Sequence, residues 1–133
     1  MKKHLLTIAL VSCFAAAQAG AMTQDEYKVS KERVEADYKV DKAKCETLDG
    51  NAKDVCMKQA QGKEKIAKAE LEQQYKPSND HAREAEQTKV DVAYNIAMEK
   101  CEDQKGDAKN ACEKQAEADK ARGKVQVDAM KKM

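Results

Sequence analysis

The sequence is poor in the residues that build large hydrophobic cores. Its 133 residues include no tryptophan and one phenylalanine, and that residue, Phe14, lies near the N-terminus. From residue 22 onward there are two leucines and two isoleucines. Burying a large aliphatic side chain stabilises a fold by about 1.5–3 kcal/mol, and an alanine methyl contributes far less. Packing alone is therefore expected to leave the fold marginal, and another constraint has to support it.

Helix breakers and catalytic residues are scarce as well. Pro77 is the one proline, and the two histidines are His4 and His81. A lone histidine without a neighbouring nucleophile or second ligand is typical of a solvated residue. The sequence contains no glycine-rich phosphate loop and no recognisable set of serine, histidine and aspartate. It therefore predicts no catalytic residue, no cofactor and no enzyme activity.

Charge is abundant but balanced. Charged residues make up 37% of the chain, and the formal net charge is +1. Lysine is interleaved with acidic residues at helical spacing, as in Glu64 and Lys68, which is typical of a solvated helix surface. A near-neutral chain has no electrostatic attraction to nucleic acid or anionic lipid. We therefore predict no nucleic-acid partner.

The N-terminus has the pattern of a secretory signal. Lysines precede an apolar run over residues 5–17, and small residues follow it. This pattern predicts a signal peptide over residues 1–21, cleaved after Ala19 or Ala21, and a periplasmic mature chain. The run is shorter than the roughly 20 apolar residues of a membrane-spanning helix, so we predict no transmembrane segment. A lipoprotein acylated at Cys13 is the less favoured alternative, because cleavage there leaves a very short signal.

Two copies of one cysteine-containing stretch organise the rest of the chain. Residues 45–56 read CETLDGNAKDVC and residues 101–112 read CEDQKGDAKNAC, 56 residues apart. Over the 29 positions that align around them, 12 are identical. Such likeness indicates an internal duplication. We expect a first helical-hairpin repeat over residues 22–76 and a second over residues 77–133.

Four cysteines remain in the expected mature chain: Cys45, Cys56, Cys101 and Cys112. Structural zinc sites use pairs of cysteines about two to four residues apart, and thiol oxidoreductases use Cys-x-x-Cys. Neither pattern occurs. In an exported chain, four paired cysteines predict two structural disulfides and no metal site.

Apolar stripes at helical spacing predict four helices of about 25 residues. We expect them from Thr23 to Leu48, from Ala52 to about Tyr75, from a cap at Ser78, Asn79 or Asp80 to the turn at Gly106, and from Ala108 towards Met130. The expected inward positions are Tyr27, Val34, Tyr38, Cys45 and Leu48; Cys56, Ala60, Ala67, Leu71 and Tyr75, with Ile66 beside them; Val90, Tyr94, Ala97 and Cys101; and Cys112, Ala116, Val125 and Ala129. The four tyrosines are therefore expected to pack between helices rather than to stack on a ligand.

The breaks between helices have recognisable chemistry. Gly50 and Gly106 suit a left-handed turn position, Asn51 suits the following N-cap, and Pro77 ends the second helix. Helices of equal length joined by short turns favour antiparallel neighbours. The predicted fold is therefore all-α, with two duplicated, disulfide-stapled helical hairpins that contain four long antiparallel helices. The sequence leaves two arrangements open, a compact bundle and two extended hairpins that lie end to end.

Two disulfide pairings fit this spacing. If the glycines are turns, each repeat is stapled internally, from Cys45 to Cys56 and from Cys101 to Cys112. If the helices run straight through, cysteines 11 residues apart stand about 16 Å apart along one axis and pair instead across a long hairpin. That arrangement resembles the twin-cysteine hairpins of the mitochondrial intermembrane space. We favour pairing within repeats, because glycine followed by Asn or Asp marks both midpoints.

The segment GNAKDVC at residues 50–56, with YKVDKAKC at residues 38–45, resembles a group of small exported proteobacterial proteins. These are often labelled cell envelope biogenesis protein TolA, or TolA-like. The likeness covers most of the expected mature chain and implies an Ala/Lys/Glu-rich helical protein of the envelope. It assigns no functional residue.

Two functions are consistent with these features. We expect a non-enzymatic periplasmic structural or interaction protein of the cell envelope, whose protein partner the sequence does not identify. The alternative is a periplasmic small-molecule or metal-binding protein that uses the acidic and tyrosine-bearing faces. The Ala-rich stripes are also compatible with completion by a second copy of the chain, as a homo-oligomer.

Overall fold

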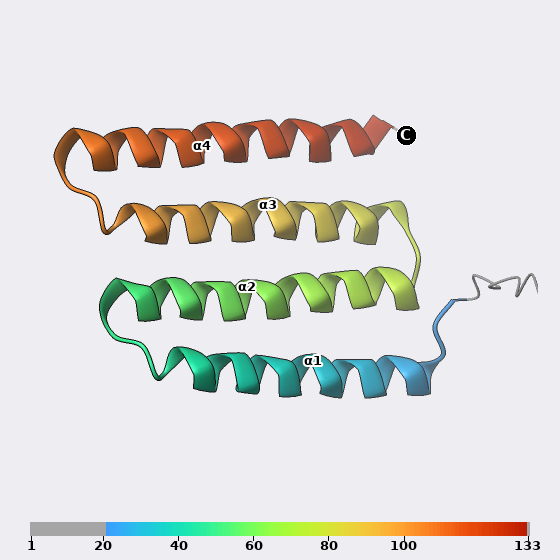
Figure 1. Cartoon of the computed structure of the whole chain (residues 1–133). Coiled ribbons are helices and arrows are strands. Elements are labelled where there is room, and N and C mark those ends of the chain that lie inside the picture. The colour runs from blue at the N-terminus through green and yellow to red at the C-terminus, as the bar shows by residue number, and fades with distance from the viewer. Residues whose placement is uncertain (1–20, 133) are drawn as a thin grey trace, which may run out of the picture.

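The protein is an array of four antiparallel α-helices (Figure 1). This computed structural model describes residues 21–132, so Cys13 and nearly all of the predicted signal peptide lie outside it. The helices are α1 (Gln24–Cys45), α2 (Gly50–Tyr75), α3 (Asn79–Cys101) and α4 (Gly106–Ala129), followed by a short 3-10 helix, η1 (Met130–Lys132). Their lengths of 22, 26, 23 and 24 residues match the expected size. The all-α prediction is confirmed, and no described helix is long and apolar enough to cross a membrane.

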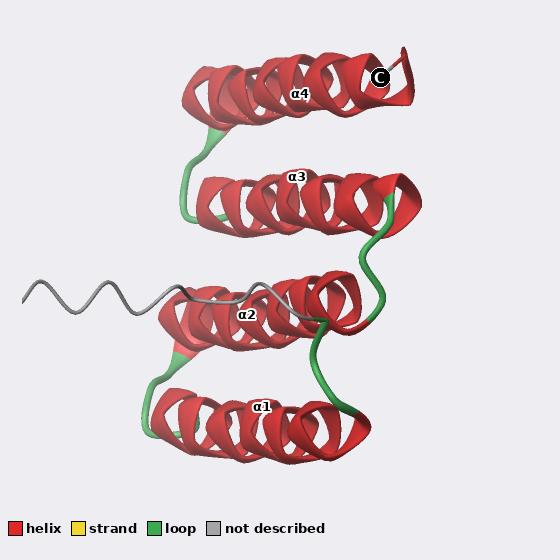
Figure 2. Ribbon diagram, turned by 90° about the vertical axis from the view of Figure 1, so that its right-hand side faces the viewer, coloured by secondary structure: helices red, strands yellow, loops and turns green. Residues whose placement is uncertain are grey.

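The four helices lie side by side in one layer. α1 contacts α2, α2 contacts α3 and α3 contacts α4, whereas within residues 21–132 no contact joins α-helices that are not consecutive; η1 contacts both α4 and α3. Figures 1 and 2, taken at right angles, show the same order, with α1 and α4 at the two edges. This layer is neither of the two arrangements that the sequence left open, because the helices form no bundle and the two hairpins lie side by side rather than end to end. Both broad faces of the layer are consequently open.

Local capping chemistry defines where helices begin. The Thr23 hydroxyl accepts a hydrogen bond from the Glu26 amide at 3.3 Å, and the Glu26 carboxylate accepts one from the Thr23 amide at 2.8 Å. This reciprocal capping box fixes the start of α1. At α3, the Ser78 hydroxyl accepts a hydrogen bond from the His81 amide at 3.0 Å. Of the three candidate caps of α3, Ser78 is the one observed, and Pro77 lies between α2 and α3 as expected.

The glycine turns are confirmed, with one correction. Gly50 and Gly106 have φ of +59° and +60°, a left-handed conformation that glycine adopts without steric cost. Each glycine begins the second helix of its hairpin, and Asp49, not Asn51, holds the N-cap position of α2. The Asn51 side chain instead donates a hydrogen bond of 3.2 Å to the backbone carbonyl of Glu99 in α3. Asn51, which was predicted to cap α2, thus joins the first repeat to the second.

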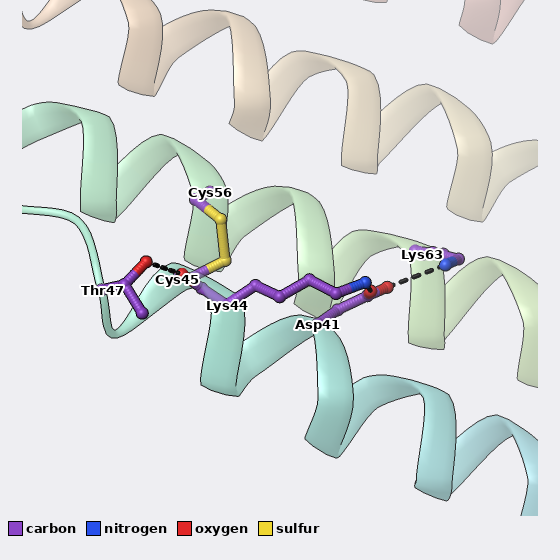
Figure 3. Close-up of a disulfide and its surroundings, with 6 residues drawn as sticks. All are labelled: Asp41, Lys44, Cys45, Thr47, Cys56 and Lys63. Atoms are coloured by element: carbon purple, nitrogen blue, oxygen red, sulfur yellow. Dashed lines mark hydrogen bonds and ion pairs between the residues drawn. A yellow bond between two sulfur atoms is a disulfide. The ribbon is translucent and has the colours of Figure 1, made fainter.

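Both disulfides form within a hairpin. Cys45 at the end of α1 bonds to Cys56 near the start of α2, and their Cα atoms are 5.4 Å apart (Figure 3). Cys101 and Cys112 are joined in the same way, with Cα atoms 5.7 Å apart. The preference for pairing within repeats is confirmed, and pairing across one long hairpin is excluded.

The buried core is small and lies along the contacts between helices. Its apolar members are Cys45, Ala60, Leu71, Ala85, Val92, Cys101, Ala116 and Val127. Only Leu71, Val92 and Val127 carry large aliphatic side chains, so the expectation of a thin core holds. Of the predicted inward positions, the tyrosines and Val34, Val90, Ala67 and Ala97 are half-buried.

Three predicted core positions are exposed. Leu48 lies in the turn after α1 and is 39% exposed, because the helix ends at Cys45. Val125 is 70% exposed, and Ala129 is exposed as well. At about 100° per residue, Val125 and Cys112 point about 140° apart around the helix axis, so the two side chains cannot share a face of α4. Val127 is buried in place of Val125.

We expect cleavage between α2 and α3 to separate the two halves without a reductant. A site-specific protease sequence inserted between Pro77 and Ser78 interrupts an exposed loop and leaves both disulfides intact. A denaturing, non-reducing gel should then show two fragments. In the matched control the same insertion lies between Leu48 and Asp49, inside the turn closed by Cys45–Cys56, and the cleaved chain should stay joined until it is reduced. Two fragments joined after cleavage at Pro77 would contradict this pairing.

Candidate functional site

Two grooves occupy equivalent places in the two repeats. The larger, of about 300 Å³, lies between α3 and α4 and is lined by Lys89, Val90, Ala93, Tyr94, Ala97, Ala116, Asp119 and Lys120. The smaller, of about 40 Å³, lies between α1 and α2 and is lined by Val34, Asp37, Tyr38, Asp41, Ala60, Lys63, Glu64 and Ala67. Each groove has a valine, a tyrosine and a buried alanine from duplicated positions. The duplication therefore produced two related surfaces of different size.

An ion pair spans the smaller groove. Lys63 of α2 lies 2.7 Å from the Asp41 carboxylate of α1, and Lys44 approaches the same carboxylate at 3.4 Å, as Figure 3 shows. The hydrogen bond from Lys63 holds the pKa of Asp41 below its ordinary value, and Asp41 raises the pKa of Lys63 in return. In the second repeat Ala97 stands where the first has Asp41. Loss of that carboxylate leaves the larger groove open.

The larger groove combines an aromatic face with a cation. The Lys120 ammonium lies 4.2 Å from the centre of the Tyr94 ring, and it also lies 3.4 Å from the Asp91 carboxylate. A cation above a ring face is attracted by the ring quadrupole. The groove can therefore hold an apolar or aromatic group beside a charge. No nucleophile paired with a base lies among its lining residues.

The remaining tyrosines join α1 to α2 at the far end from the disulfide. Tyr27 and Tyr75 stack with ring centres 4.4 Å apart. The Tyr27 hydroxyl donates a hydrogen bond to the Glu72 carboxylate, which raises the pKa of Tyr27 because it favours the protonated phenol. These contacts agree with the prediction that the tyrosines pack between helices.

Between the repeats, α2 and α3 meet at a small residue and an ion cluster. A methyl group at Gly62 would overlap Cγ1 of Val92, so the glycine permits the close approach. Lys89 of α3 lies 2.8 Å from Glu70 of α2 and 2.9 Å from Glu86 of its own helix. The hydrogen bond to Glu70, and then that to Glu86, raises the pKa of Lys89. The interface is thus held by charge at its rim and by small-residue packing at its centre.

The predicted site residues were the four cysteines, and the structure brings them together as two disulfides. Within the described part of the chain no group of three or more His, Cys, Asp or Glu side chains could hold a metal ion. His81 lies at the start of α3, with Nδ1 2.7 Å from the Lys76 carbonyl oxygen. The contact of Gly62 with Val92 was not among the predictions from the sequence, although a glycine inside a helical pattern is a recognised sign of close packing.

Removing the charge of Glu72 should lower the pKa of Tyr27. The change Glu72→Gln weakens the acceptor, so the phenol should titrate nearer the ordinary tyrosine value of about 10. An ultraviolet titration of phenolate formation measures the shift. The control Glu64→Gln alters a carboxylate of the same helix that pairs with Lys68 and should leave the curve unchanged.

The sign of the pH effect follows from the raised pKa. Stabilisation by the Tyr27 hydrogen bond should be fully present below about pH 10, the pKa of an unfolded tyrosine, and lost as the pH rises through the folded-state pKa. Unfolding free energies of the wild type and Tyr27→Phe should therefore converge at high pH. An undiminished difference there would refute the assignment.

Comparison with known protein families, with curated proteins and with solved structures finds no match to this chain. Its function therefore has to be inferred from its own residues and their arrangement.

Proposed function

We propose that this chain is a non-enzymatic, exported protein of the cell envelope that acts as a scaffold or interaction module through its surface. The observation that carries the proposal is the one-layer arrangement, in which both broad faces of α2 and α3 are open. A layer of this kind offers a large area to another macromolecule. Its grooves hold no activated nucleophile, which is consistent with binding rather than catalysis.

Export is supported by the sequence and by the thiol chemistry. The N-terminal pattern over residues 1–21 is that of a cleavable signal, and disulfides persist mainly in oxidising compartments such as the periplasm. The resemblance to TolA-like envelope proteins points to the same compartment. We infer a periplasmic location and a partner that is itself an envelope protein.

Site-specific photo-cross-linking tests this function. Gln61 is an exposed position of the interior helix α2. Since α1 and α3 cover the two sides of α2, a photoreactive residue at this position lies on one of the broad faces of the layer. We expect the full chain, expressed in a Gram-negative host, to enter the periplasmic fraction and to form one dominant adduct with an envelope protein. The same probe at Gln104, in the exposed turn between α3 and α4, should give little of that adduct.

Three results would contradict the proposal. These are retention of the chain in the cytoplasm with free thiols, the absence of adducts from Gln61 and other exposed positions of α2 and α3, and turnover of a substrate that a single surface substitution abolishes. The first result would overturn the export, and the other two would overturn the scaffold function.

The larger groove favours one alternative, a periplasmic small-molecule-binding protein. Tyr94 and Lys120 place a ring and a cation beside an apolar surface of alanines. If this alternative holds, calorimetry against a panel of envelope metabolites and metal ions should detect a ligand, and Tyr94→Ala should weaken its binding by about tenfold, the effect of ~1.4 kcal/mol. Tyr38→Ala, at the equivalent place in the smaller groove, is the control. Silence across the panel would reject the alternative.

A further inference from the structure

We propose that copies of this chain associate head to tail, with the outer side of α4 in one copy packed against the outer side of α1 in the next. The internal contact between α2 and α3 is the template for this association. The duplication makes α1 equivalent to α3 and α2 equivalent to α4, with an offset of 56 residues. The chain therefore contains one complete interface between repeats, formed by α2 and α3. The outer side of α4 corresponds to the α2 half of this interface, and the outer side of α1 corresponds to the α3 half.

The template interface has a defined register. Gly62 of α2 meets Val92 of α3, and both residues are buried. Since the helices are antiparallel, Ala69, two turns after Gly62, lies level with Ala85, two turns before Val92. Ala85 is 5% exposed and Ala69 is half-buried, as expected for facing positions. Small side chains thus line the centre of the contact.

The edges keep this pattern in a complementary form. Positions 62 and 92 correspond to Ala118 of α4 and Ala36 of α1, so a glycine facing a valine becomes two facing alanines. Both alanines are exposed in the single chain. The change preserves the combination of small residues that allows helices to approach closely.

Large apolar side chains are exposed at the flanking positions. Ala69 and Ala85 correspond to Val125 of α4 and Val29 of α1, which are 70% and 58% exposed. Val40, 54% exposed, corresponds to the half-buried Ile96 of α3. Of the four large hydrophobic residues exposed in the described chain, three therefore occupy positions that the internal interface covers. A second copy placed in the same register would cover all three.

Charge selects the head-to-tail arrangement. Ile66 lies four residues after Gly62 in α2, and it is level with Thr88, four residues before Val92 in α3. The corresponding edge positions are Arg122 of α4 and Glu32 of α1. Both charged residues are exposed in the single chain, and Arg122 contacts Asp119 of its own helix. The opposite charges meet only when α4 of one copy faces α1 of another. Pairing of two α1 edges or two α4 edges does not bring them together.

The ends of the helices fit the same geometry. The end of α4 and the start of α1 lie at one end of the layer, as do the end of α2 and the start of α3 (Figure 1). An added copy therefore continues the alternation of helix directions. Such a contact joins two different surfaces, so it extends into an open chain unless the rotation between copies closes a ring. It uses the edges, whereas the proposed function uses the broad faces, and either can fail alone.

Sedimentation velocity over a range of concentrations tests the association. Protein expressed from the full sequence should form dimers and longer species as its concentration rises. Val29→Glu and Val125→Glu each place a charge in one half of the contact, and each should weaken self-association by about tenfold or more. Circular dichroism should be unchanged, because both valines are exposed. Gln61→Glu, on a broad face, is the matched control and should assemble as the wild type does.

Mixing the two variants distinguishes head-to-tail from symmetric contact. Val29→Glu retains an intact α4 edge and Val125→Glu an intact α1 edge, so the mixture should form a dimer and stop there. Likewise, Arg122→Glu should weaken association, and adding Glu32→Arg to the same chain should restore it. A wild type that stays monomeric up to its solubility limit, a failure of the mixture to form dimers, or an assembly abolished by only one of the two valine variants would overturn the proposal.

Discussion

The disulfides beside the two tight turns fix the register on which the rest of the structure depends. Closing a loop of about 11 residues contributes roughly 3 kcal/mol in the chain-entropy description. That contribution is large beside what the methyl groups of the buried alanines Ala60, Ala85 and Ala116 can supply. Once Cys45 is joined to Cys56, Lys63 lies beside Asp41 and Tyr27 reaches Tyr75 at the far end. The covalent bond at one end of the hairpin and the aromatic pair at the other hold the helices in line.

In the described part of the chain no disulfide joins the two repeats, and different interactions hold them together. Gly62 lets α2 approach Val92 of α3 closely, although glycine inside a helix costs about 1 kcal/mol relative to alanine. The Lys89 and Glu70 pair and the Asn51 hydrogen bond flank this contact. Because each interior helix is covered on two sides, the pattern can in principle repeat indefinitely. Within residues 21–132 no α-helix covers the outer side of α1 or of α4.

Local sequence was sufficient to predict the elements. The approximate span of each helix, the cap at Ser78, the positive-φ glycines and the pairing of cysteines within repeats all depend on residues close together in the chain. Export remains a prediction from the N-terminal pattern, and the domain boundaries remain one from the duplication. Among the residues of the candidate site, only the cysteines could be predicted from the sequence, because each pair of cysteines flanks a recognisable glycine turn.

Only the tertiary structure decided how these elements assemble. An alanine-rich stripe is compatible with a bundle and with a layer, since small side chains allow approach from several directions. The sequence placed Val125 in the core, although it lies on the open side of α4, and it gave no indication that Lys63 would meet Asp41 or that Gly62 would meet Val92. The sequence by itself determined four helices and two staples, because hydrogen bonds within a helix and short loops are local. The single layer, its grooves and its edges depend on contacts between distant residues, which local periodicity does not specify.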